Sequence, residues 1–233
     1  MMSKREDLRA SRTGTVINMS SRKMESLLAK ALVEVSTKIQ KDFKVELVHE
    51  PKVFLKEIVE HLRIAHPEVD FEYKFPSSFL LPDGGILYIR NKKGEKHVLL
   101  ISEAKRQGTN DAREEEGLPK QSKGNAIERL GKNVTGFRMW LSTEGIFPFV
   151  VFGQGVDFST DSSILDRVTT IAMFAPLNRI EVMNVGDEKQ FNRGSFFFRP
   201  ELWTVPEMVE IMYEISKRSL YYYFAKYGEE NFH

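Results

Sequence analysis

The sequence predicts an α/β fold in which helices flank a mixed β-sheet. Residues 86–90 and 97–104 are β-rich runs separated by a polar turn that contains glycine, which is the pattern of an antiparallel hairpin. Residues 125–142 carry apolar side chains at helical spacing. Residues 147–152 form a wholly apolar run, as expected of a central strand covered on both faces. Strand, hairpin, helix and buried strand in succession favour a sheet between two layers of helices.

Length and composition are those of an ordinary globular protein. A chain of 233 residues suits one domain with a full core, and 41% hydrophobic residues is normal for such a domain. The sequence contains no cysteine, which excludes disulfides and thiolate metal sites, so a metal would have to rest on carboxylates or histidines. Without a signal-peptide pattern or a bilayer-spanning apolar run, we expect a cytoplasmic protein with no membrane partner.

Basic residues are concentrated at the N-terminus. The net charge of +1 does not by itself indicate a nucleic-acid-binding protein, but residues 1–24 carry six basic side chains against two acidic ones. We therefore expect residues 1–20 to form a basic arm within a single domain that spans residues 1–233. Such an arm can bind phosphates or can simply be solvated.

The elements before the hairpin can be taken in order. Apolar residues between 24 and 39 fall on one helical face, with Ser20 or Ser21 as the predicted N-cap. A second helix is predicted over residues 51–66, between two prolines. Alternation of apolar and charged residues over 69–75 predicts a half-buried strand that leads into the hairpin.

The elements after the hairpin begin with a polar loop over residues 107–124, and a loop of this length in a compact domain is usually functional. Beyond the helix and the buried strand, residues 162–174 are predicted to be helical, and an irregular stretch follows them. Thr204 and Glu207 have the spacing of a capping box, which predicts a C-terminal helix.

Three charged side chains are expected to meet at the open end of the hairpin. Asp83 and Lys105 lie equally far along the chain from Gly94, at the centre of the turn, so antiparallel pairing brings Asp83 opposite Lys105 and Glu103. Because side chains alternate along a strand, Glu103 and Lys105 share one face and Ala104 points to the other.

Two carboxylates and an ammonium at one point suit Mg²⁺. This ion binds one or two carboxylates, keeps several waters and completes its shell with substrate phosphate. Lys105 beside the ion is placed to orient or deprotonate an attacking water. A Glu-x-Lys triplet alone is usually a solvated face, and a PDGG string alone is usually a turn. Their pairing is what favours a metal site.

A second candidate site is the string GNAIER, which begins at Gly124 at the predicted helix start. Free backbone N–H groups and the positive end of the helix dipole favour a phosphate or a groove edge there. In addition, Asn pairs naturally with adenine, Glu accepts from an exocyclic amine and Arg donates to purine N7 or O6. Taken alone, the string is better explained as a capped helix with solvated side chains.

Together the motifs resemble a known family. Pro82-Asp83 followed by Glu103-Ala104-Lys105 resembles the PD…(D/E)xK signature of the restriction-endonuclease-like nucleases. The longer strings PDGGI, EAKRQG, GNAIER and FPFVVFGQG resemble the EcoRI family of type II restriction endonucleases. The resemblance implies a restriction-endonuclease-like core, in which helices sandwich a central mixed sheet of about five strands.

The same resemblance implies an activity. It is the Mg²⁺-dependent hydrolysis of phosphodiester bonds in double-stranded DNA, at a short palindromic site with an AATT core. In this scheme Asp83 and Glu103 hold the metal together with the Ala104 backbone carbonyl, and Lys105 serves the attacking water. A cognate DNA methyltransferase is expected in the same system, although not as a stable partner.

The family's DNA-binding residues can also be carried over. Asn125, Ala126, Glu128 and Arg129 match the positions that read the AATT core, and a palindrome read symmetrically implies a homodimer. The further residues assigned to DNA binding are Gln107, Lys123 and Arg167.

Two positions leave the outer base pair open. Arg167 fits the family's ILxR pattern, but the partner arginine three residues later is Thr170 here. Lys123 stands where relatives with different outer base pairs also differ. A relaxed outer position is therefore as plausible as a full six-base site.

Two alternative functions remain. The first is another nuclease of the same superfamily, acting in repair, junction resolution or nicking. The second is a sequence-specific DNA-binding protein whose metal site is silent. The second alternative is disfavoured because all three polar residues of the site, Asp83, Glu103 and Lys105, are present.

Overall fold

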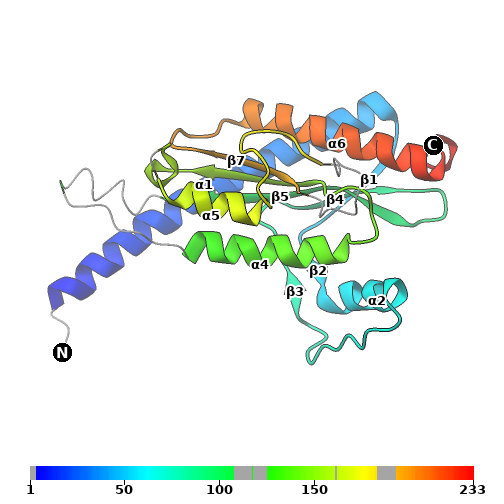
Figure 1. Ribbon diagram of the computed structural model, residues 1–233. Helices are drawn as coiled ribbons and strands as arrows, with labels where there is room; N and C mark the ends of the chain where they lie inside the picture. Colours follow the sequence, from blue (N-terminus) through cyan, green and yellow to red (C-terminus); the bar gives the residue numbers. More distant parts are fainter. Residues whose placement is uncertain (1–3, 108–116, 118–124, 161, 183–192) are drawn as a thin grey trace.

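The computed structural model describes residues 4–107, 117, 125–160, 162–182 and 193–233. Side chains are described from residue 22 onward, except those of Asn125 and Ala126. The fold has three layers, with a five-stranded mixed sheet between two layers of helices (Figure 1). The predicted α/β class and the predicted sheet of about five strands are confirmed.

The central sheet has the strand order β1-β4-β5-β6-β7. The first three, β1 (Glu46–Glu50), β4 (Gly85–Arg90) and β5 (Lys96–Arg106), are antiparallel neighbours, and the β4–β5 pair is the predicted hairpin. The other two, β6 (Phe149–Gln154) and β7 (Ser195–Arg199), run parallel to β5. All of β6 is buried, as its apolar sequence predicted.

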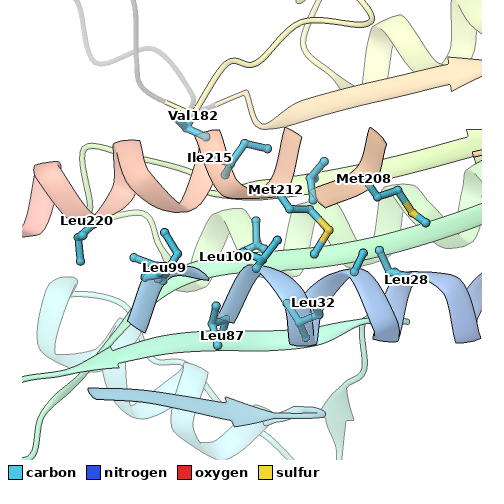
Figure 2. Packing of buried hydrophobic residues seen from close by; sticks show 14 of the residues in the cluster. Leu28, Leu32, Leu87, Leu99, Leu100, Val182, Met208, Met212, Ile215 and Leu220 are labelled. Carbon is cyan, nitrogen blue, oxygen red and sulfur yellow. The ribbon is translucent and has the colours of Figure 1, made fainter. Parts of the chain in front are cut away.

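One face of the sheet is covered by α1 (Lys4–Phe43) and α6 (Val205–Tyr227). Figure 2 shows how Leu87 of β4 and Leu99 of β5 pack there with leucines and methionines of the two helices. The predicted capping box at Thr204 is present, and Met208, Met212 and Ile215 of α6 are buried. The part of α1 before the sheet extends beyond the rest of the molecule (Figure 1).

The opposite face is covered by α2 (Leu55–Ala65), α4 (Asn125–Trp140) and α5 (Ile164–Ile171). Alternate residues of the strands face this second core, because successive side chains of a strand point to opposite sides. Ile101 of β5 belongs to it, so Glu103 and Lys105, two and four residues later, also point toward α4. The register of β5 therefore decides that the charged site lies under α4.

Smaller elements complete the chain. β2 (Val53–Phe54) and β3 (Phe79–Leu80) form a separate two-stranded sheet beside α2. Short 3₁₀ helices occupy Val156–Phe158 and Glu229–Asn231. Among the described residues, no helix is both long and apolar enough to cross a membrane.

Several predicted boundaries are wrong. The predicted strand over residues 69–75 is not a strand, and Phe75 is 67% exposed, because the alternating residues have no neighbouring strand with which to pair. The second helix begins at Leu55 rather than near residue 51, since β2 occupies the intervening residues. Ser20 and Ser21 lie inside α1 and are not an N-cap.

Two strands of the central sheet, β1 and β7, were not predicted, and neither were β2 and β3 of the small sheet. β1 has only five residues and lies at the edge of the sheet, where half-exposed polar side chains hide its pattern. β7 follows a stretch that was read as irregular. The helix predicted over residues 162–174 is also shorter, because Met173 and Phe174 have positive φ angles that end it.

Candidate active site

The PDGG turn, residues 82–85, places Asp83 beside β5. The turn closes with a 3.0 Å hydrogen bond from its last N–H to its first carbonyl, and the Gly84 N–H donates to the Ser102 carbonyl at 2.9 Å. A Cβ atom on Gly84 would overlap the Ser102 hydroxyl, so the close approach to β5 requires glycine. On the other side of the turn, His49 Nε2 lies 3.1 Å from the Gly84 carbonyl oxygen.

The three predicted side chains meet at this turn. Lys105 Nζ donates to Asp83 Oδ2 at 2.9 Å and to Glu103 Oε1. The backbone reinforces the arrangement, because the Asp83 N–H donates to Glu103 Oε2 at 3.1 Å and the Ala104 N–H donates to Asp83 Oδ2 at 3.2 Å. Local pairing in the hairpin thus holds both carboxylates at fixed positions around one ammonium.

Burial makes this group of charges strongly interdependent. Glu103 is only 1% exposed, and burial raises the pKa of its carboxyl although the Lys105 ammonium acts in the opposite direction. For Lys105, burial alone lowers the pKa, but the Glu103 and Asp83 carboxylates outweigh it and raise the pKa above its ordinary value. Lys105 is therefore positively charged at neutral pH in the metal-free protein, and it acts as a hydrogen-bond donor.

The donor set fits a magnesium ion. Asp83 Oδ2, Glu103 Oε1 and the Ala104 carbonyl oxygen, the last at 3.1 Å, all accept hydrogen bonds from Lys105 Nζ. Three oxygen atoms thus already surround one positive charge, and Mg²⁺ prefers oxygen ligands. In the part of the chain that the structure describes, no three His, Cys, Asp or Glu side chains are placed to hold a metal ion together. At this site the third oxygen belongs to the backbone. A metal ion at these oxygens would compete with the Lys105 ammonium.

The proposed base-reading residues lie at the start of α4. The helix begins at Asn125, and Ala126 is in its first turn, although their side chains lie outside the described residues. Glu128 and Arg129 are exposed, as a role in contacting DNA requires. Lys123 lies outside the described residues.

The remaining two predicted DNA-binding residues are placed differently from each other. Arg167 is exposed on α5, and the Thr170 hydroxyl three residues later donates to the Arg167 carbonyl at 2.7 Å. Gln107 is only 5% exposed at the end of β5, where its N–H donates to the Gln154 carbonyl at 3.0 Å. Its DNA-binding role stays a prediction. The polar loop that follows it lies outside the described residues, except for Gly117.

Two polar residues at the site were missed by the sequence reasoning. Asn133 of α4 donates from Nδ2 to Glu103 Oε1 at 3.2 Å, and His49 of β1 contacts the PDGG turn. Asn133 comes four residues after Arg129, and this helical spacing was the available signal that it shares the face of α4 on which Arg129 lies. The His49 contact depends on the pairing of β1 with β4, which was not predicted.

The fold and the site define a class of protein. A mixed sheet whose hairpin brings a PD turn against an ExK strand is the core of the PD-(D/E)xK nucleases. The family model described as restriction endonuclease EcoRI matches residues 11–230. The chain therefore belongs to the EcoRI family of restriction endonucleases.

Two curated relatives agree with this assignment. The type II restriction enzyme RsrI of Cereibacter sphaeroides is 27% identical over 240 residues, which cover 88% of this chain and 87% of the relative. The type II restriction enzyme EcoRI of Escherichia coli is 28% identical over 199 residues, which cover 70% of this chain and 72% of the relative. The similarity extends well beyond the PD and ExK motifs.

Proposed function

We propose that this protein is a type II restriction endonuclease that hydrolyses double-stranded DNA with Mg²⁺ at a palindromic site with an AATT core. The observation that carries the proposal is the convergence of Asp83, Glu103 and the Ala104 carbonyl on Lys105, in a chain of the EcoRI family. These are the oxygen ligands and the positive charge that phosphodiester hydrolysis needs at one point.

Each group has a role in this chemistry. Asp83 and Glu103 would hold the ion with the Ala104 carbonyl, and the ion would supply positive charge to offset the negative charge that develops on the scissile phosphate. Lys105 lies beside both carboxylates, where its N–H groups can orient the attacking water. Burial of Glu103 strengthens these interactions, because charges attract more strongly where water is excluded.

The reading of the DNA falls to α4. Asn125, Ala126, Glu128 and Arg129 contact the bases of the AATT core, and the exposure of Glu128 and Arg129 supports this role. A two-fold symmetric site requires a homodimer that presents α4 twice. The outer base pair is open, because Thr170 stands where the family has an arginine three residues after the one that Arg167 matches.

Incubation of the protein with a mixed-sequence plasmid and Mg²⁺, followed by sequencing of the fragment ends, tests the proposal. We expect discrete cuts at AATT-containing palindromes that stop when the metal is chelated. Scattered or structure-dependent cuts would indicate a different nuclease of the superfamily. Specific retention of DNA without any cut would indicate a non-cleaving DNA-binding protein.

A further inference from the structure

One hydrogen bond directly joins the proposed metal site on the hairpin to α4, the helix that is proposed to read the bases. Among the donors that described residues offer to the Glu103 carboxylate, the Asp83 N–H and Lys105 belong to the hairpin and its turn. The third, the side-chain amide of Asn133 at 3.2 Å, belongs to α4. Glu103 is therefore held by the element that is proposed to read the bases as well as by its own hairpin.

Asn133 is placed so that a displacement of α4 at the proposed base-reading residues would also move its side chain. Arg129 lies one helical turn before Asn133, and residues four apart lie on the same helix face. The residues that follow each of them, Leu130 and Val134, are buried against the sheet. A helix fixed by such a face moves as a rigid element, so a displacement at Arg129 is passed to the Asn133 amide rather than absorbed.

The chemistry of the amide also suits a positioning role. Lys105 is a cation, so it competes with a metal ion for the Glu103 oxygen that both contact. Asn133 is neutral, and it can orient the same carboxylate without excluding the ion. Hydrogen bonds of this kind to metal ligands typically change metal affinity or activity by about 10- to 100-fold when removed.

We propose that Asn133 is a positioning residue that links base reading at the start of α4 to the metal-binding carboxylate of Glu103. In this arrangement, binding of the cognate DNA sequence fixes the position of α4, and α4 in turn orients the Glu103 carboxylate for cleavage. An altered site leaves α4 displaced and the carboxylate poorly oriented. This inference rests on the proposed function, and it assigns to Asn133 a share of the cleavage specificity without any contact with a base.

The test uses the full-length variants Asn133→Leu and Asn133→Ala. Leucine keeps the branched shape of asparagine without the donor, which separates hydrogen bonding from packing, and alanine provides a second variant if leucine disturbs the fold. Thr135→Ala is the matched control, since Thr135 is exposed on the same helix. Single-turnover cleavage is measured on the AATT site and on a site with one base pair of AATT changed. Mn²⁺ binding to the DNA-free protein is measured by calorimetry.

We expect both Asn133 variants to cut the AATT site about 10-fold more slowly, with a smaller loss at the altered site, so that discrimination falls. Mn²⁺ affinity should fall about 10-fold, and the control should match the wild type. Unchanged discrimination together with unchanged Mn²⁺ affinity would overturn the inference, and so would an equal loss at both sites. A wild-type protein that cuts no DNA would instead overturn the proposed function, and the calorimetry would still judge the Asn133–Glu103 link.

Discussion

The hairpin site and the start of α4 lie on the same side of the sheet but are built in opposite ways. Glu103 is buried and Lys105 is mostly buried, and both are tied to Asp83 by side-chain and backbone hydrogen bonds. Glu128 and Arg129 are exposed. The proposed metal-binding groups are thus already held together without DNA, whereas the proposed base-reading side chains are left open to contact it. Changes at the two places should therefore have separable effects.

The largest effect is expected from Asp83→Ala. This change removes a proposed metal ligand and an acceptor for Lys105, and loss of about 4 kcal/mol of transition-state stabilisation slows cleavage roughly 10³-fold. Single-turnover cleavage of an AATT duplex with Mg²⁺ provides the measurement. Asp70→Ala, at an exposed residue outside the site, is the control. Cleavage at the wild-type rate would show that Asp83 has no part in the chemistry.

Lys105→Ala should separate catalysis from metal binding. Cleavage is expected to fall by roughly 10² to 10⁴-fold, the usual contribution of a group that serves an attacking nucleophile. Metal affinity, measured by calorimetry with Mn²⁺, should stay the same or increase, because the competing ammonium is gone.

Lys30→Ala, which removes an exposed positive charge from α1, is the control for both measurements. Weaker metal binding by Lys105→Ala than by this control would contradict the account. It would mean that the ammonium supports the site rather than competing with the ion.

The effect of Arg129→Ala on base reading should be visible in DNA binding. We expect binding to an AATT duplex to weaken by about 1 to 3 kcal/mol, the value of a bidentate base contact, while binding to unrelated DNA barely changes. Fluorescence anisotropy with both duplexes measures the difference. Lys132→Ala, at an exposed residue of the same helix, removes the same charge as a control. Equal losses on both duplexes would identify Arg129 as a phosphate contact.

The smallest expected effect concerns the scaffold, where Glu207 accepts hydrogen bonds from Arg199 and Thr204. The Arg199 hydrogen bonds, followed by those from Thr204, lower the pKa of Glu207 to about 2. A lowered pKa stabilises the fold above the unfolded value of 4.5, and this contribution disappears as the pH falls toward 2.

Because the Glu207 side chain is 41% exposed, Glu207→Ala should lower the free energy of unfolding at pH 7 by only about 1 kcal/mol, as for an ordinary cap. Urea unfolding from pH 7 down to pH 2 should show the difference from wild type shrinking below pH 4.5. Glu210→Ala, an exposed change on α6, is the control. A difference that does not depend on pH would contradict the assignment.

The same comparison explains how much could be predicted from sequence. The hairpin site was predictable because its residues are tied by one turn, so that spacing from Gly94 together with strand alternation decides which side chains meet. The Asn133–Glu103 contact was not predictable in this way. It depends on how a helix about 30 residues farther along packs on the sheet, and nothing in the local pattern of either segment encodes that packing.

The fold shows a similar limit. The buried strand β6 and the capping box of α6 were predicted because an apolar run and a Thr-x-x-Glu spacing are local signals. The alternation over residues 69–75 is an equally clear local signal, but that segment has no strand beside it. Edge strand β1 exists because β4 offers a partner. Strand formation is decided by neighbours, and the sequence of a segment alone does not name them.

The central claim is that the hairpin site carries out cleavage and that α4 recognises the DNA sequence. The most direct test of this division is the DNA preference of the Asp83→Ala variant. The ratio of its dissociation constants for a scrambled duplex and an AATT duplex, measured with Ca²⁺ in place of Mg²⁺, isolates base reading from cleavage. We predict that the variant keeps a preference of about 10³-fold or more for the AATT duplex. Equal affinity for the two duplexes, with the fold intact, would show that the hairpin and α4 do not have separate roles.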